Sequence, residues 1–140
     1  MIKVDRILAI DYGDKRIGVA ISDPLGFTAQ EYETIIVTNN VNHFLRIKEI
    51  IDENNVMKVL VGMPFLMNGK KGERAEKTEE FIKKLEKYVS VPVFTLDERL
   101  TTSEAKKIMI SLGQKTGKKK EKIDRLSAAL LLENYLRSIT

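Results

Sequence analysis

The sequence predicts a mixed α/β fold, a five-stranded sheet with helices on both of its faces. Three strand-like runs follow one another near the start of the chain, which is typical of an antiparallel hairpin region. Strand-like and helix-like runs then alternate, which favours parallel strands joined by crossover helices. With 140 residues, no linker and no internal repeat, residues 1–140 are expected to form one domain.

The first three predicted strands are short and apolar. Arg6–Asp11 is an apolar run that ends in an acid, and Arg16–Ser22 is a second run of the same kind. The residues Tyr12–Lys15 between them predict a tight turn. A third strand is expected at Tyr32–Thr38, which is rich in Ile, Val and Thr.

Helical periodicity begins after the third strand. Apolar residues recur at helical spacing from Phe44 to Ile51, and Asn54-Asn55 are expected to end this helix. The pattern then predicts a strand at Met57–Gly62, a helix at Glu73–Tyr88 and a strand at Val91–Leu96.

The last part of the chain predicts two further helices. Thr101–Glu104 has the spacing of a capping box and is expected to open the first of them. Gly113–Lys120 is rich in glycine and lysine and predicts a mobile loop. The last helix is expected from about Glu121 to Arg137, with Asp124 in its opening turn.

Composition excludes several classes of chemistry and of location. The sequence contains no cysteine and one histidine, His43, so disulfides, thiolate sites and histidine-rich zinc sites are excluded. Its apolar runs are far shorter than the roughly 20 residues of a membrane span, and the charged start lacks the pattern of a signal peptide. We therefore expect a soluble, cytoplasmic protein without a membrane partner. The net charge of +4 is modest, but basic residues gather between Lys106 and Arg125, which favours a polyanionic partner.

Three acids occupy positions at which sites commonly form. Asp11 ends the first strand, Glu98 follows the strand Val91–Leu96, and Asp124 opens the last helix. If their strands run parallel, Asp11 and Glu98 share one sheet edge, which Asp124 can also reach. Taken singly, they also read as a turn residue, a surface ion-pair partner and a helix-dipole residue. Together they would repel one another, and Mg²⁺ or Mn²⁺ would relieve that repulsion.

Four motifs, in this order and spacing, resemble the YqgF (also called RuvX) family of the ribonuclease H-like superfamily. The motifs are Leu8–Asp23, then Val61–Gly69 followed by Arg74-Ala75, then Asp97–Ala105, and finally Ile123–Leu132. The resemblance covers nearly the whole chain. It implies a ribonuclease H-like fold and a nuclease acting in Holliday junction resolution or in processing of the 5′ end of pre-16S ribosomal RNA.

The resemblance also implies roles for individual residues. Asp11, Glu98 and Asp124 are expected to be the catalytic acids and to bind Mg²⁺ or Mn²⁺. The implied partner is structured RNA or branched DNA, bound by a monomer or a homodimer. The residues expected to contact this nucleic acid are Lys15, Arg16, Arg99, Lys118, Lys119, Lys120 and Arg125. Arg125 departs from the family pattern, which has a small residue after the acid, so it either pairs with Asp124 or binds phosphate.

Two alternatives from other functional classes remain open at this point. The same fold can serve as a non-catalytic nucleic-acid-binding or ribosome-assembly module, in which the acids would not cut. An actin-like ATP-binding domain also begins with an Asp-x-Gly turn such as Asp11–Gly13. Proteins of that type usually need two such domains, and this chain has room for one.

Overall fold

A computed structural model of the protein describes residues 5–98 and 117–139. The order of elements agrees with the prediction, although the helix expected to open at Thr101–Glu104 lies outside the described residues. The elements are β1 (Arg6–Tyr12), β2 (Arg16–Ser22), β3 (Ala29–Ile36), α1 (His43–Asn54), β4 (Val56–Met63), α2 (Glu73–Leu85), β5 (Val93–Asp97) and α4 (Gly117–Ser138).

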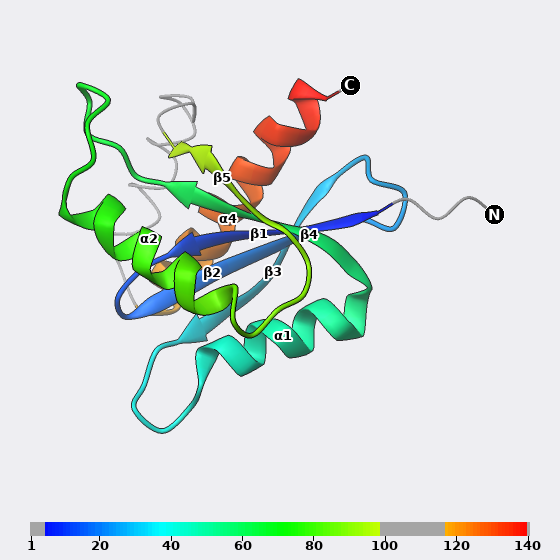
Figure 1. The fold of residues 1–140 in the computed structure, drawn as a ribbon. Helices are drawn as coiled ribbons and strands as arrows, with labels where there is room; N and C mark the ends of the chain where they lie inside the picture. The colour runs from blue at the N-terminus through cyan, green and yellow to red at the C-terminus, as the bar shows by residue number, and fades with distance from the viewer. Residues whose placement is uncertain (1–4, 99–116, 140) are drawn as a thin grey trace.

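The strands form one mixed sheet in the order β3-β2-β1-β4-β5 (Figure 1). β2 pairs antiparallel with both β1 and β3, whereas β4 runs parallel to both β1 and β5. The predicted hairpin region and the predicted parallel region are both confirmed. Because β1, β4 and β5 are parallel, their carboxyl ends lie at the same edge of the sheet, on the left in Figure 1.

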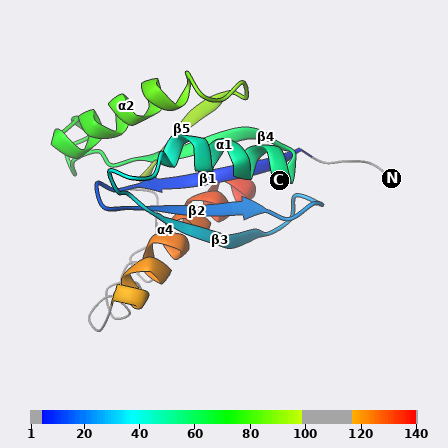
Figure 2. The same cartoon turned by 90° about the horizontal axis from the view of Figure 1, so that it is seen from below.

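Helices cover both faces of the sheet, as predicted. Seen along the sheet, α1 and α2 lie on one side and α4 on the other (Figure 2). The α1/α2 side is packed with large aliphatic residues, including Leu8, Ile10 and Val59. The α4 side is a smaller core in which Ala9 and Ala20 meet Ala128, Leu132 and Leu136 of the helix.

Small residues on the α4 side of the sheet let this helix approach closely. A Cβ atom built on Gly18 in β2 would overlap the backbone carbonyl group of Asp124 in α4. A Cβ atom built on Gly62 in β4 would lie 2.6 Å from the Cδ1 atom of Leu131. Glycine inside a strand commonly marks such a close approach of another segment. The position of α4, and of the acid that it carries, therefore depends on these two glycines.

The third strand begins earlier than the sequence pattern predicts. It spans Ala29–Ile36 instead of Tyr32–Thr38, and Ala29 pairs with Ser22 across a short turn. The carboxylate of Asp23 holds this turn by accepting hydrogen bonds from the backbone N–H groups of Leu25, Phe27 and Thr28. Pairing across the turn therefore recruits polar residues into the strand that composition alone would leave out.

Two other boundaries differ by a few residues. α2 ends at Leu85 and not at Tyr88, because the backbone N–H groups of Lys87 and Tyr88 bond three residues back and close a turn. β5 begins at Val93 and not at Val91, which leaves Pro92 outside the strand. Neither change moves the carboxyl end of β5 away from that of β4.

The last helix begins at Gly117, so the predicted loop Gly113–Lys120 is wrong for residues 117–120. Lysine and glutamate are good helix formers, and nothing after Gly117 interrupts them. As a result Asp124 lies in the second turn of α4, away from the end of the helix dipole. No helix in the described part of the chain is both long and apolar enough to cross a membrane.

Replacing Gly18 with alanine is expected to destabilise the fold by about 1–3 kcal/mol or more, because the new methyl group would collide with helix backbone. Urea denaturation measures this cost. Gly72→Ala is the matched control, since a Cβ atom there meets the flexible end of the Leu66 side chain at 3.0 Å. Equal costs for the two variants would contradict the close approach of α4 to β2.

Candidate active site

Asp11 lies near the carboxyl end of the central strand and points to the α4 side of the sheet. Side chains alternate along a strand, so Asp11 shares the face of Ile7 and Ala9, which pack in the core beneath α4. Its partner in the β1–β2 register is Gly18. The interpretation of Asp11 as a turn residue is therefore wrong.

Glu98 directly follows β5 and turns back toward the neighbouring strand. A Cβ atom built on Gly62 in β4 would lie 2.6 Å from Glu98 Oε1, so this glycine leaves room for the carboxyl group. The Glu98 carboxyl group lies close enough to that of Asp11 for its charge and a side-chain hydrogen bond to raise the pKa of Asp11. Two carboxyl groups in contact can share a hydrogen bond only if one of them carries a proton.

Asp124 comes to the same edge of the sheet from α4, across Gly18. Its carboxylate accepts a hydrogen bond from Arg16 Nε at 2.7 Å, in an ion pair whose side chains are 31% and 19% exposed for Arg16 and Asp124. Thr34 in β3 holds the helix in this position by donating a hydrogen bond to the backbone carbonyl of Glu121 at 2.6 Å. The helix is thus fixed to the sheet on the N-terminal side of Asp124.

The electrostatics of the site disfavour an ionised Asp11. Its pKa lies well above the usual value, because of burial first, then the charge of Glu98, the hydrogen bond with Glu98 and the charge of Asp124. Arg74, at the start of α2, acts in the opposite direction. Burial also raises the pKa of Asp124, although the hydrogen bond and charge of Arg16 lower it. Asp11 is therefore influenced by both of the other acids, Glu98 and Asp124.

The carboxylate oxygens of these acids suit a hard divalent cation, but the three acids are not arranged around a single position. Carboxylate oxygens are the ligands that Mg²⁺ and Mn²⁺ prefer. Within residues 5–98 and 117–139, no three acidic or histidine side chains are arranged to hold a metal ion as they stand. Asp11 and Glu98 form a contacting pair, whereas Asp124 is turned to Arg16. In the structure, Oδ2 of Asp124 is therefore engaged by Arg16.

A cavity of about 330 Å³ opens beside Asp11 and Asp124. Lys15, Arg16 and Arg74 also line it, so cations surround the acids. No role was predicted for Arg74 from the sequence. The signal that could have identified it is its position directly after the second motif. Gly62 lies in β4, in the strand that the sequence predicts, and a glycine inside a strand pattern was the available signal for the space that it leaves.

The residues predicted to bind nucleic acid do not all lie together. Lys15 and Arg16 line the cavity, Lys15 being exposed and Arg16 paired with Asp124. Arg125 donates to Thr34 Oγ1 at 3.2 Å and pairs with Glu31 at 3.5 Å, so it binds β3 and does not pair with Asp124.

The remaining predicted contacts lie at or beyond the start of α4. Lys119 and Lys120 lie in its first turn, Lys120 being exposed, and not in a loop. The backbone of Lys118 is helical, but its side chain is outside the described part of the structure, as is the whole of Arg99. The part played by these residues in binding stays a prediction.

Known structures share this fold over nearly its whole length. The Thermus thermophilus RuvC structure in complex with a Holliday junction substrate superimposes with a TM-score of 0.60 and 15% identity, covering 96% of both chains. The fowlpox virus resolvase in complex with Holliday junction DNA gives a TM-score of 0.57 and 16% identity, covering 96% of this chain and 98% of that one. The predicted ribonuclease H-like fold is thereby confirmed.

Relatives by sequence are much closer. A protein of Ruminiclostridium cellulolyticum named "Putative pre-16S rRNA nuclease" is 50% identical over 135 residues, which is 96% of this chain and 95% of the relative. A protein of the same name from Halothermothrix orenii is 47% identical and covers 94% of each chain. The family model described as "RuvX: Holliday junction resolvase" matches residues 5–138. The resemblance inferred from the four motifs is confirmed: the chain belongs to the RuvX family of Holliday junction resolvases, a family of nucleases.

Proposed function

We propose that this protein is a metal-dependent endonuclease that hydrolyses phosphodiester bonds of structured nucleic acid at Asp11, Glu98 and Asp124. The observation that carries the proposal is the influence of Glu98 and Asp124 on Asp11. Asp11 is hydrogen-bonded to Glu98 and feels the charge of Asp124, and both effects raise its pKa. Such an accumulation of acids is costly without a bound cation.

Asp11 and Glu98 are the residues that would hold Mg²⁺ or Mn²⁺, and Asp124 would complete the site. A divalent ion bound there would activate a water molecule and stabilise the negative charge that develops on the phosphate. The contact between Asp11 and Glu98 keeps these two donors together, and the hydrogen bond from Thr34 to α4 keeps Asp124 within reach. Those bonds hold the acids before substrate arrives.

Arg16 has two possible partners at this site. In the structure it neutralises Asp124 through the 2.7 Å contact. If Asp124 turns to a cation, the guanidinium group is released at the wall of the same cavity, beside Lys15 and Arg74. A guanidinium group is well suited to phosphate oxygens. Binding of the cation and of the phosphate would thus be coupled through one side chain.

Precursor 16S ribosomal RNA is the substrate that we propose first, and branched DNA is the second candidate. The relatives that share about half of their residues with this chain are named for the RNA. Holliday junctions are favoured by the description of the family model. The comparisons do not favour the two alternatives from other classes, a non-catalytic binding module and an actin-like ATP-binding domain.

Cleavage is expected to require the three acids and a divalent cation. Labelled precursor 16S RNA ends and a labelled four-way DNA junction, each incubated with Mg²⁺ or Mn²⁺, test this directly. We expect Asp11→Asn to reduce the rate of cleavage of the preferred substrate by at least about a hundredfold, since a carboxylate ligand is lost. Chelator should abolish the reaction.

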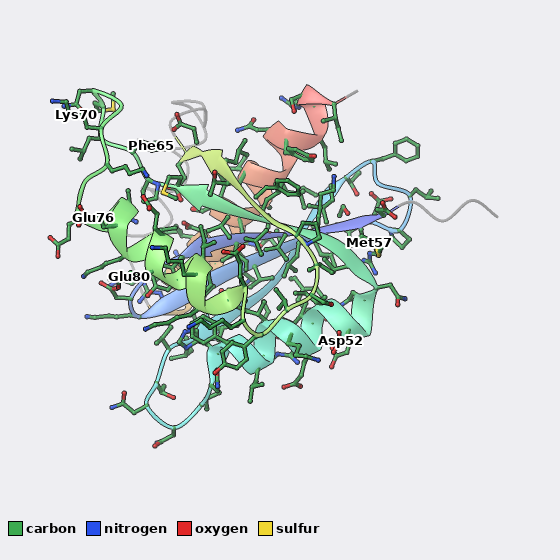
Figure 3. All side chains as sticks on the ribbon, in the orientation of Figure 1. Asp52, Met57, Phe65, Lys70, Glu76 and Glu80 are labelled. Atoms are coloured by element: carbon green, nitrogen blue, oxygen red, sulfur yellow. The ribbon has the colours of Figure 1, made fainter. Side chains whose placement is uncertain are left out.

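Asp52→Asn is the matched control for this assay. Asp52 is an exposed acid on α1, ion-paired with Lys48 at 3.0 Å and far from the carboxyl ends of β1 and β4 (Figure 3). Its rate should equal that of the unaltered protein. Retained cleavage by the Asp11→Asn variant would contradict the proposal. Tight binding of the nucleic acid by the unaltered protein without any cleavage would favour the non-catalytic module.

The fold is expected to become more stable when Asp11 loses its charge. In chelator, the raised pKa of Asp11 means that keeping this carboxyl in the fold at neutral pH costs free energy. The folded state is stabilised as the pH falls through the raised pKa of Asp11 toward 3.8, the usual pKa of an aspartate in an unfolded chain. Asp11→Asn should therefore melt a few degrees higher than the unaltered protein at neutral pH, and the difference should shrink in acid.

The same thermal melts with added Mn²⁺ test whether the acids bind a divalent cation. It should raise the melting temperature of the unaltered protein and of Asp52→Asn, but have little effect on Asp11→Asn. Identical melting temperatures for all three proteins at every pH, with no response to Mn²⁺, would be incompatible with a cation site at Asp11.

A further inference from the structure

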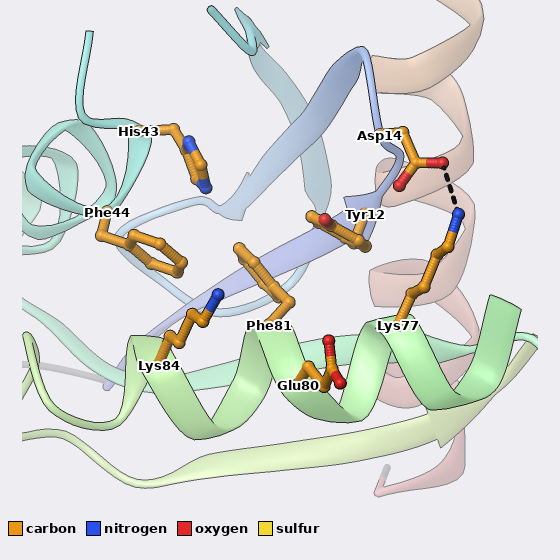
Figure 4. A pocket seen from close by; sticks show the side chains of 8 residues that line it. All are labelled: Tyr12, Asp14, His43, Phe44, Lys77, Glu80, Phe81 and Lys84. Carbon is orange, nitrogen blue, oxygen red and sulfur yellow. Dashed lines mark hydrogen bonds and ion pairs between the residues drawn. The ribbon is translucent and has the colours of Figure 1, made fainter. Parts of the chain in front are cut away.

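A second cavity lies on the other face of the sheet, between the start of α1 and the outer side of α2 (Figure 4). Its volume is about 280 Å³, near the lower end of the range for small-molecule sites. Four aromatic side chains form its walls: Tyr12 from β1, His43 and Phe44 from α1, and Phe81 from α2. Aromatic rings from three separate elements thus converge on one opening.

Most pairs of these rings are nearly parallel, although His43 is tilted by 38° from Phe44. Tyr12 stacks on Phe81 with centroids 4.4 Å apart and an angle of 22° between the planes. The imidazole of His43 is also nearly parallel to Phe81, at 19°, but its centroid is 6.3 Å away. Phe81 is buried, whereas Tyr12 and His43 are partly exposed. Tyr12 and His43 therefore offer ring surface that a ligand can reach, whereas Phe81 supports Tyr12 from within the core.

Charged groups stand at the rim of this aromatic cavity. Lys84 and Glu80 lie on the same helix as Phe81, and Figure 4 shows the Lys84 side chain extending toward the space between His43 and Phe81. Burial first, and then the charge of Lys84, lowers the pKa of His43, so its ring is neutral at neutral pH. A lysine can contact phosphate, a carboxylate can accept a hydrogen bond from an amino group of a base, and the rings can stack on it. A purely apolar ligand would have no use for the charged groups.

The aromatic cavity adjoins the cavity of the candidate active site. Tyr12 and Asp14 line both of them, so only the end of β1 and the turn after it separate the two. Lys77 of α2 secures this turn by an ion pair with Asp14 at 3.2 Å (Figure 4). A strand whose phosphate lies at Asp11 has a short path over this turn into the aromatic cavity.

We propose that the aromatic cavity is a substrate-binding subsite that holds one unpaired base of the nucleic acid against the partly exposed rings of Tyr12 and His43. Lys84 contacts the adjoining phosphate, and Glu80 favours bases that carry an exocyclic amino group. The inference rests on the proposed function, because it takes the bound strand to be the one that is cut. It gives the enzyme a preference for junctions between paired and unpaired segments.

Nuclear magnetic resonance can observe this subsite directly, because His43 is the only histidine in the sequence. The imidazole resonances of the full chain, in chelator to prevent cleavage, are followed during titration with a short single-stranded oligoadenylate. We expect a saturable shift of the His43 signals from the ring current of the stacked base. The same oligonucleotide in a duplex should give at most a small shift, and ribose 5-phosphate none.

A pair of lysine variants separates the subsite from general attraction to the helix. Lys84→Gln is expected to weaken the oligoadenylate affinity, read from the His43 shift, by several-fold to about tenfold, roughly the contribution of one base contact. Lys83→Gln removes the same charge from the neighbouring exposed position and should change the affinity less than twofold. Equal effects of the two variants would overturn the assignment of Lys84.

Three other outcomes would overturn the subsite itself. They are no His43 shift on addition of oligoadenylate, an equal shift with ribose 5-phosphate, or an equal shift with the duplex. Failure of the subsite is distinguishable from failure of the proposed function, because the titration needs no metal and the cleavage assay needs no His43 signal. Cleavage without a His43 shift removes only the subsite, whereas a His43 shift without cleavage removes the proposed nuclease activity and leaves the aromatic cavity as a base-binding site.

Discussion

The contact between the backbone of α4 at Asp124 and the bare Cα of Gly18 determines where the third acid of the site lies. Any side chain at that position of β2 would push the helix outward. Because Gly18 is paired in register with Asp11, the helix that rests on it brings Asp124 beside the central strand. Gly62 plays the same part on the other side of β1, where it leaves space for Glu98. The missing side chains at Gly18 and Gly62 thus make room for Asp124 and Glu98 beside β1.

The acids gathered in these gaps work against the stability of the fold. Asp11 is held among groups that raise its pKa, and the Arg16–Asp124 ion pair only partly offsets the same tendency at Asp124. The surrounding structure supplies the compensation, since Thr34 and Arg125 bind α4 to β3 and the apolar core beneath α4 is fully buried. Perturbed pKa values of this kind cluster at functional sites.

Much of the framework was predictable because it follows from short-range patterns. β1 and β2 were bounded within one residue, since buried apolar runs and an intervening turn are local signals. Asn55, predicted to end α1, is its C-cap in the left-handed conformation, with φ of 54°. The start of β3 was missed because pairing across the Asp23 turn, and not composition, draws Ala29 into the strand.

The parts of the site that escaped prediction depend on contacts between distant segments. Arg16 and Asp124 are 108 positions apart in the sequence, and no local pattern could show that they form an ion pair. Arg125 was considered as a partner for Asp124 because it is adjacent in the chain, yet in the helix it points to Glu31 and Thr34 instead. The three acids themselves were predicted from the ends of the strands and from the motifs, and in the structure Glu98 and Asp124 both raise the pKa of Asp11.

The most direct test of the account is a crystal structure of the protein with Mn²⁺, in which anomalous scattering locates the ion. The account predicts a peak between the carboxylates of Asp11 and Glu98, with Asp124 turned toward it and released from Arg16. Anomalous density elsewhere, or an Asp11–Glu98 hydrogen bond and an Arg16–Asp124 ion pair that persist at saturating Mn²⁺, would contradict the claim that these acids form one metal site.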